Sequence, residues 1–248
     1  MGNTQSWQRD IEDLPKLAPR FEMDARHTAL LIVDMQNLFG HPDHGFAAYL
    51  GERYPEAFAY YMQRLSSLVM PNHIRLLDFF RKNGLRIIYV TVGPQLPDMT
   101  DMVPLSRGES AAERQRGRGR KYARWMAPAG SFEHRILEDI KPMPGELVIN
   151  KTSYGAFNST SIDQTLRNMG IDFLVITGVA THACVETTAR DAADRGYRCV
   201  MVDDATATFT KYLHDATLRA FATLFGRVAN TEDVCTELRQ KVGAVAGP

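Results

Sequence analysis

Three side chains that could perform hydrolytic chemistry lie at the ends of apolar runs. The run Thr28-Ala-Leu-Leu-Ile-Val ends in Asp34, Lys151 directly follows Glu146-Leu-Val-Ile-Asn150, and Cys184 lies six residues past Gly178. A thiolate can attack a carbonyl carbon, a carboxylate can carry the thiol proton to a leaving nitrogen, and a lysine supplies positive charge. The set therefore predicts covalent hydrolysis through Cys184.

The predicted position of Cys184 favours this chemistry. A cysteine thiol has an unperturbed pKa of about 8.5, so little thiolate is present at neutral pH. We expect Cys184 to begin a helix, whose N-terminus carries partial positive charge, and we expect Lys151 to add a full charge. Both should favour the thiolate. The backbone amides from Ala180 to Cys184 would be placed to hold an oxyanion.

Each residue alone has a simpler interpretation. A single cysteine in an α/β protein is commonly a small buried hydrophobe. Asp34 could accept hydrogen bonds at a strand end, and Lys151 could be a solvated surface lysine. The functional interpretation rests on the conjunction of three strand ends with complementary chemistry.

Apolar runs alternating with helical patterns would bring these residues together. Aliphatic runs of this length are typical of strands buried on both faces. Strands separated by helices of about a dozen residues predict right-handed crossovers, a mainly parallel doubly wound sheet and a three-layer αβα sandwich. Ligands of such sheets bind beyond the carboxyl ends of the strands. We expect strands at 28–34, 85–92, 146–150, 173–178 and 198–202, helices at 55–83 (broken or kinked at Pro71), 159–169, 183–195 and 212–225, and a loop at 35–54.

Length and composition limit the class of protein. The 248 residues suit an irregular arm, 1–26, followed by one domain, 27–248. Equal numbers of basic and acidic residues, 29 each, give no electrostatic support for nucleic-acid or membrane binding. No apolar run is long enough to span a bilayer and the N-terminus is polar, so we expect a cytoplasmic protein. Three widely spaced cysteines indicate reduced thiols.

Several sequence blocks carry a resemblance to a known family. The strongest is Ile176-Thr-Gly-Val-Ala-Thr-His-Ala-Cys-Val-Glu-Thr-Thr-Ala-Arg-Asp-Ala192. Two others, Leu30-Leu-Ile-Val-Asp-Met-Gln-Asn37 and Asn150-Lys-Thr-Ser-Tyr-Gly-Ala-Phe-Asn-Ser-Thr160, agree in order and spacing, and Val202-Asp-Asp-Ala-Thr206 matches more weakly. Over residues 27–230 the chain resembles the isochorismatase-like cysteine hydrolase superfamily.

The resemblance implies a catalytic triad of Asp34, Lys151 and Cys184, and no cofactor. It also implies a non-proline cis peptide bond at Val179–Ala180 and an oxyanion hole built from the amides of Ala180 and Cys184. The block from Lys151 to Thr160 looks most like enzymes acting on ureidoacrylate, biuret or N-carbamoylsarcosine. Relatives are often dimers or tetramers, so a homodimer or homotetramer is expected.

Side chains near these three residues in sequence are candidates for binding a substrate. An aromatic wall around a few polar groups is usual in small-molecule sites, although large aromatics are also usually core residues. His182 stands where many relatives carry Asn. The candidates are Asn37, Phe39, Tyr154, Phe157 and His182.

Two other segments have weaker interpretations. His41, Asp43 and His44 lie too close to Asp34 to match the metal site of nicotinamidases, so no metal is expected. The basic segment 107–124 could clamp a substrate carboxylate, pair with a neighbouring subunit or simply be solvated, with Trp125 as a lid anchor.

Together these observations predict an amidohydrolase that cleaves a small amide, ureido or carbamoyl compound through a thioester. Two alternatives remain. An isochorismatase-type vinyl ether hydrolase would use Asp34 as its acid and could dispense with Cys184. A catalytically silent member would act as a binding or assembly module, against which the intact triad argues.

Overall fold

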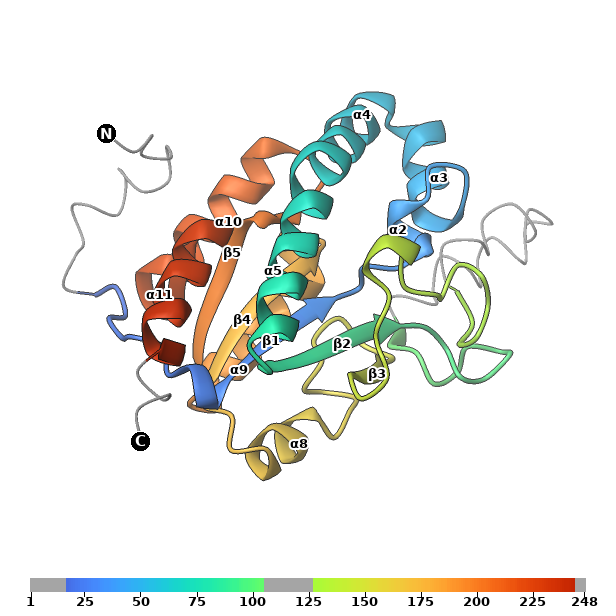
Figure 1. The fold of residues 1–248 in the computed structure, drawn as a ribbon. Coiled ribbons are helices and arrows are strands. Elements are labelled where there is room, and N and C mark those ends of the chain that lie inside the picture. The colour runs from blue at the N-terminus through green and yellow to red at the C-terminus, as the bar shows by residue number, and fades with distance from the viewer. Residues whose placement is uncertain (1–16, 105–126, 244–248) are drawn as a thin grey trace.

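A parallel six-stranded sheet forms the centre of the protein (Figure 1). The computed structural model describes residues 17–104 and 127–243. All strand pairs are parallel, in the order β3-β2-β1-β4-β5-β6. The strands are β1 (Thr28–Val33), β2 (Arg86–Val92), β3 (Leu147–Lys151), β4 (Phe173–Val179), β5 (Arg198–Ala207) and β6 (Gly226–Ala229).

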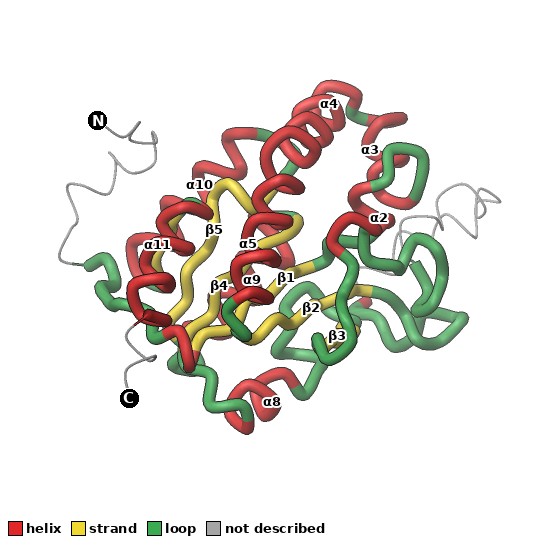
Figure 2. Tube along the Cα trace, viewed as in Figure 1, coloured by secondary structure: helices red, strands yellow, loops and turns green. Residues whose placement is uncertain are grey.

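Helices cover both faces of the sheet, which confirms the predicted doubly wound αβα architecture (Figure 2). One layer contains α4, α5 and α11, and the other contains α8, α9 and α10. The α-helices are α2 (Asn37–Gly40), α3 (Gly45–Arg53), α4 (Pro55–Arg64), α5 (Met70–Lys82), α8 (Ile162–Asn168), α9 (Glu186–Asp194), α10 (Lys211–Leu224) and α11 (Thr231–Gly243). Shorter 3-10 segments are η1 (Ala25–His27) and η4 (Glu138–Ile140), and the π-helical segments are η2 (Leu65–Val69) and η5 (Thr181–Val185).

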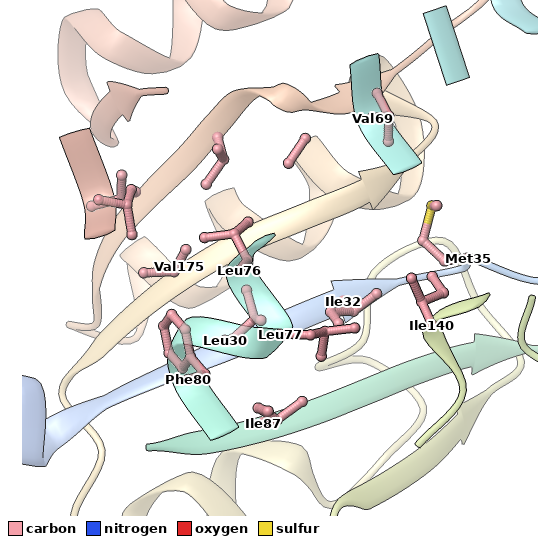
Figure 3. Close-up of a cluster of buried hydrophobic side chains, with 14 of the residues drawn as sticks. Leu30, Ile32, Met35, Val69, Leu76, Leu77, Phe80, Ile87, Ile140 and Val175 are labelled. Atoms are coloured by element: carbon pink, nitrogen blue, oxygen red, sulfur yellow. The ribbon is translucent and has the colours of Figure 1, made fainter. Parts of the chain in front are cut away.

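Strand β1 shows how the sequence builds two cores. Its six side chains are all buried, and alternate residues point to opposite faces. Leu30 and Ile32 pack with Leu76 and Phe80 of α5 (Figure 3), whereas Leu31 belongs to the opposite core. A continuous apolar run is what a strand covered on both faces requires.

The strand order places a topological switch point between β1 and β4. From β1 the chain moves to β2 and β3 on one side, and then returns to β4 on the other side. Val33 at the end of β1 pairs with Gly178 near the end of β4. Crossovers that leave in opposite directions open a crevice at such a point.

Close packing at this point requires glycine at position 178. Gly178 has φ +114°, and a Cβ there would lie 1.9 Å from the Val33 carbonyl oxygen. Any larger residue would therefore push β1 and β4 apart at the switch point.

Strand β5 is irregular beside β4. Ile176 pairs with Met201 and Gly178 pairs with Thr206, so extra residues of β5 bulge out between these two pairs. The bulge contains Asp203 and Asp204, which would otherwise occupy regular strand positions. Bulges re-aim side chains near functional sites.

Several sequence expectations need correction. Residues 35–54, expected to be a loop, contain α2 and α3. Gly40, Pro42 and Gly45 do not abolish the helices but separate them, and Gly45 has φ +56°. Pro71 does not break the helical segment: it lies in the first turn of α5, directly after the π-helical turn η2. The predicted helix 159–169 is shorter in the structure, and β6 and α11 were missed.

The remaining expectations concern the chain ends and the basic segment. The described part of the arm lies against helix α11. Glu237 Oε1 in that helix accepts hydrogen bonds from the Met23 amide at 2.7 Å and from Arg227 Nη1 at 3.0 Å. Residues 1–16, and the basic segment 107–124 with Trp125, lie outside the described residues. Within 17–104 and 127–243, no helix combines the length and the apolarity needed to cross a membrane.

Candidate active site

Asp34 and Lys151 form a buried ion pair at the carboxyl edge of the sheet. Asp34 is the first residue after β1, and its amide donates to the Val90 carbonyl at 2.8 Å. Lys151 is the last residue of β3, so it lies within the strand rather than after it. Its Nζ donates to Asp34 Oδ2 at 2.8 Å and to the Ser153 carbonyl at 3.0 Å. Both side chains are 0 % exposed, which excludes the solvated-surface interpretation of Lys151.

Cys184 lies in a π-helical turn rather than at the start of an α-helix. The turn η5 precedes α9, and Cys184 is 8 % exposed. The peptide bond between Val179 and Ala180, where a cis bond was expected, is cis. The Ala180 carbonyl then accepts from the amides of Ala183 and Val185 at 3.0 and 3.3 Å. The backbone therefore turns sharply from β4 into the segment that carries the sulfur.

The three side chains influence one another's ionisation. Burial raises the pKa of Asp34, and the charge of Lys151 and a hydrogen-bonding contact with the Cys184 thiol only partly offset this. Burial alone would lower the pKa of Lys151, but the charge of Asp34 outweighs it, so that pKa is raised. Asp34 Oδ1 is buried and has no well-formed hydrogen bond among the described residues, which leaves it available to the thiol.

Burial opposes the thiolate that the sequence position of Cys184 favours. Burial first, and the charge of Asp34 second, raise the pKa of Cys184 to about 12 against the opposing effect of Lys151. The sequence indicated the cation but not the depth at which the sulfur lies. The raised pKa of Cys184 favours the thiol, beside a carboxylate whose own raised pKa suits it to take up a proton.

Of the candidate binding residues, Asn37 holds the loop that precedes β3, whereas Phe39 packs against α3. Asn37 Nδ2 donates to the Phe132 carbonyl at 2.9 Å, and the Asn37 amide donates to the Arg135 carbonyl at 2.9 Å. The half-buried ring of Phe39 packs on Phe46, with the ring centroids 6.0 Å apart. Both residues follow Asp34 closely and rest on the carboxyl side of β1.

Of the other three, His182 lies nearest to the nucleophile, two residues before Cys184. Its Nδ1 hydrogen-bonds with Thr208 Oγ1 at 2.5 Å, and its ring meets that of Phe209 edge-on at 5.3 Å. Tyr154 is 42 % exposed. Phe157 packs against Tyr197, next to the amino end of β5, with the Arg195 guanidinium over its ring. The contacts of Phe157 are therefore those of a core residue.

Sequence reasoning missed two groups close enough to Asp34 to interact with its charge. His134 acts to lower the pKa of Asp34, and Asp34 contributes, after burial, to the raised pKa of Tyr61. His134 Nε2 lies 2.7 Å from Oδ1 of Asn150, the strand residue directly before Lys151. Neither residue lies in a recognisable motif, so only the folded structure could reveal them.

The histidines between β1 and α3 make local contacts. His41 Nδ1 accepts from the Asp43 amide at 3.3 Å, and His44 Nδ1 lies 3.2 Å from Glu133 Oε1. Among residues 17–104 and 127–243, no three His, Cys, Asp or Glu side chains converge as metal ligands would.

A surface hollow of about 610 Å³ lies beside this region, at the junction of α3, α4 and the start of α10. It meets the site through Phe209, whose ring contacts His182, and none of its lining residues belongs to the triad.

Comparison with known proteins places this arrangement in a family. The model of the isochorismatase domain matches residues 28–233, a span that includes Asp34, Lys151 and Cys184. The chain belongs to the isochorismatase domain family. The family match covers all six strands and the helices from α2 to α10, and it ends at residue 233 in the first turn of α11.

Family relatives with curated names support the assignment. The chain is 30 % identical to ureidoacrylate amidohydrolase RutB of Variovorax paradoxus over 222 residues, covering 89 % of this chain and 84 % of that protein. It is also 30 % identical to the RutB protein of Pseudomonas syringae pv. syringae, covering 90 % and 92 %.

Solved structures of other proteins share the fold. A cysteine hydrolase from Pseudomonas syringae pv. phaseolicola superposes with a TM-score of 0.73 at 21 % identity, covering 90 % of this chain and 98 % of that one. N-carbamoylsarcosine amidase from Thermoplasma acidophilum superposes with a TM-score of 0.58 at 27 % identity, covering 83 % and 96 %.

Proposed function

We propose that this isochorismatase-family hydrolase is a cysteine-dependent amidohydrolase acting on a small ureido, carbamoyl or amide compound. The observation that supports it most is the buried Asp34 carboxylate, which accepts a hydrogen bond from Lys151 on Oδ2 and is also in hydrogen-bonding contact with the Cys184 thiol. The RutB relatives and the N-carbamoylsarcosine amidase carry names that describe hydrolysis of C–N bonds. The substrate class is taken from them.

In the first half of the reaction, the Cys184 sulfur forms a bond to the substrate carbonyl carbon while its proton passes to Asp34. The raised pKa values of the thiol and the carboxyl suit a transfer that occurs during attack rather than before it. The amides of Ala180 and Cys184 stabilise the oxyanion. Asp34 then protonates the departing ammonia or amine as the carbon–nitrogen bond breaks.

In the second half, water attacks the thioester and Asp34 takes its proton. The carbon–sulfur bond breaks, and the proton returns to Cys184 as the acid product leaves. Lys151 stays protonated throughout, because the charge of Asp34 raises its pKa. It keeps the carboxylate oriented and balances negative charge on the sulfur.

Vinyl ether hydrolysis is the second candidate, because the matching family model bears the name of isochorismatase. There Asp34 would protonate the substrate directly and Cys184 would not be needed. The buried thiol beside Asp34 favours the amidohydrolase.

A panel of ureido acids, carbamoyl amino acids, simple amides and isochorismate separates these functions, with ammonia or product release as the readout. We expect turnover of a C–N substrate that Cys184→Ala abolishes and Cys235→Ala, which changes a cysteine of α11, preserves. Intact mass should show an acyl adduct on Cys184. Turnover by Cys184→Ala would exclude the thioester route, and activity on isochorismate alone would identify the ether hydrolase.

A further inference from the structure

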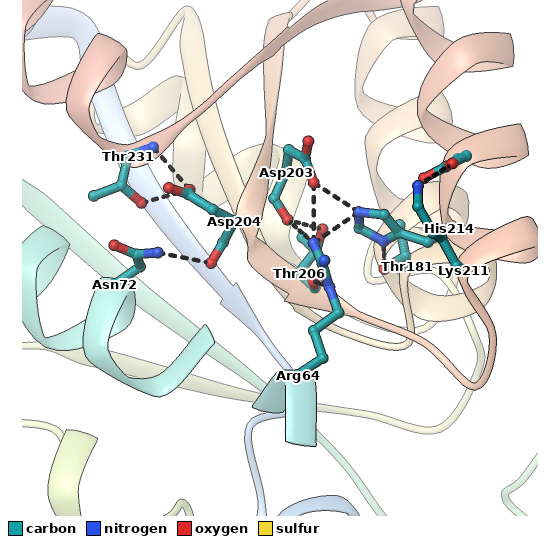
Figure 4. Close-up of polar contacts among 10 residues, drawn as sticks. Arg64, Asn72, Thr181, Asp203, Asp204, Thr206, Lys211, His214 and Thr231 are labelled. Carbon is teal, nitrogen blue, oxygen red and sulfur yellow. Dashed lines mark hydrogen bonds and ion pairs between the residues drawn. The ribbon is translucent and has the colours of Figure 1, made fainter. Parts of the chain in front are cut away.

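A buried chain of polar groups links helix α4 to the turn that carries Cys184 (Figure 4). Arg64, the last residue of α4, donates through Nη2 to both the carbonyl oxygen and Oδ1 of Asp203 at 2.7 and 2.9 Å, and through Nε to the Thr206 carbonyl at 2.9 Å. Asp203 Oδ1 lies 2.8 Å from His214 Nε2. His214 Nδ1 lies 3.0 Å from Thr181 Oγ1, and Thr181 opens η5.

We assign the hydrogens from an ionised Asp203 and a neutral His214. An ionised carboxylate only accepts hydrogen bonds, so His214 must carry its hydrogen on Nε2 to bond Asp203. Nδ1 is then an acceptor, and the Thr181 hydroxyl donates to it. Arg64 Nη2 also lies 2.9 Å from His214 Nε2. With hydrogen on both nitrogens, neither accepts from the other, and each donates instead to Asp203 Oδ1. Burial lowers the pKa of His214 against the opposing effect of its hydrogen bond to Asp203, in keeping with a neutral ring.

The polar chain depends on the bulge of β5. Asp203 lies within it, and the other bulge carboxylate, Asp204, accepts from the amide and hydroxyl of Thr231 at 2.8 Å each. The Asp204 carbonyl accepts from Asn72 Nδ2 at 3.0 Å. The bulge is thus anchored to α5 and α11, so it gives Asp203 a fixed position from which to orient His214.

Thr181 is the point where this chain reaches the proposed chemistry. Its side chain is fully buried, and it lies between Ala180 and Cys184, whose amides form the proposed oxyanion hole. The neighbouring His182 is held on the other side of the turn by Thr208. A displacement of about 1 Å at a reacting group can cost roughly a hundredfold in rate.

We propose that His214 is a positioning residue, which accepts the hydroxyl hydrogen of Thr181 and so fixes the turn bearing Ala180 and Cys184, while Asp203 and Arg64 set its tautomer. This rests on the proposed function, because the turn is assigned the oxyanion hole and the nucleophile. Arg64 and Asp203 act through His214 and touch no reacting atom.

The test uses Thr181→Val, which keeps the size of the side chain but removes the hydroxyl donor. We expect its kcat to fall about tenfold to a hundredfold while KM changes less than threefold. Thr181→Ser, which keeps the hydroxyl, should retain at least a third of the wild-type kcat. Thr217→Val in α10 makes the same replacement at another buried threonine and should leave kcat unchanged.

A double-mutant cycle separates positioning from stability. If His214 acts through Thr181, then Thr181→Val combined with His214→Phe should lose no more kcat than the poorer single variant. Multiplying losses, or a Thr181→Val enzyme with wild-type kcat, would overturn the proposal. A wild type without activity on any C–N substrate would instead count against the proposed function.

A second readout needs no turnover. In ¹⁵N NMR spectra of the folded protein, the His214 ring should show a protonated Nε2 and an unprotonated, hydrogen-bonded Nδ1. In Thr181→Val the Nδ1 signal should move toward that of a free acceptor while Nε2 stays the same. A hydrogen on Nδ1 in the wild type would overturn the assigned direction of the chain.

Discussion

The Nζ atom of Lys151 lies 2.8 Å from Asp34 Oδ2, and neither side chain is accessible to solvent. The two residues are separated by 117 positions in the chain. They meet because β1 and β3 are parallel and end at the same edge of the sheet. A buried ion pair costs more desolvation than it returns unless further contacts satisfy it, and here the Ser153 carbonyl and the Cys184 thiol supply them.

Lys151→Met should destabilise the fold by about 3–5 kcal/mol, because it leaves the Asp34 charge buried without a partner. The pKa of Asp34 is already raised by burial, and loss of the cation, which opposes that rise, should raise it further above the unfolded value. The loss should therefore be smallest in acid, where Asp34 is protonated in both states, and grow as the pH rises through the folded-state pKa. Urea denaturation of wild type and variant at pH 5 and pH 8 measures the difference.

The control for that prediction is Asp34→Asn combined with Lys151→Met. Removing both charges should cost less than the sum of the single changes, because no unpaired ion remains. Equal losses at the two pH values, together with additive single changes, would show that the pair carries no electrostatic coupling.

Cys184 should react slowly with iodoacetamide at neutral pH, with a rate that rises throughout the alkaline range in which the protein stays folded. The reason is its pKa of about 12, which leaves almost no thiolate at pH 7.5. Peptide mass mapping distinguishes Cys184 from Cys199 and Cys235. Fast alkylation of Cys184 at pH 7, compared with the unfolded chain, would show that the resting sulfur is a thiolate after all.

Asp34→Asn should have opposite effects on alkylation and turnover. The charge of Asp34 raises the pKa of Cys184, so its removal next to Lys151 should lower that pKa and speed alkylation. Turnover should nevertheless be lost, because no group remains to carry the proton to the leaving nitrogen. The two rates measured on one preparation decide the matter, and a variant slow in both assays would point to a misfolded site.

The sequence predicted the fold class, and the meeting of Asp34 with Lys151, because both depend on strong local signals. Continuous apolar runs identified five of the six strands, and the blocks around Asp34, Lys151 and Cys184 predicted that these side chains gather at one edge of the sheet. Burial of a particular atom is a property of the assembled layers, so the upward shift in the pKa of Cys184 could not be predicted. The contacts among Thr181, His214 and Arg64 could not be predicted either. They form only because β5 bulges and the last residue of α4 reaches the bulge.

The acid limb of the pH–rate profile should report Asp34. Its pKa is raised above 3.8, so kcat/KM should fall as the pH drops through that raised value, because a protonated Asp34 cannot accept the thiol proton. The raised pKa of Lys151 predicts no alkaline loss from its deprotonation while the protein remains folded. A profile that stays flat down to pH 4 would assign the proton transfer to another group.

Gly178→Ala should be far more damaging than an ordinary substitution at a glycine with positive φ. Gly196 offers the matched control: its φ is +91°, but an added Cβ would meet nothing within 4 Å, so Gly196→Ala should cost only backbone strain, about 1–3 kcal/mol. At Gly178 the same strain is joined by a clash with the Val33 carbonyl oxygen at 1.9 Å, an atom fixed in the central strand.

Relief of this clash requires β1 and β4 to separate where Asp34 follows β1 and the Cys184 turn follows β4. Circular dichroism melts should therefore show a much larger loss for Gly178→Ala, and any folded fraction should lack turnover. Similar melting temperatures for the two variants would mean that the switch point can yield, and that glycine at position 178 is not required for the approach of the two strands.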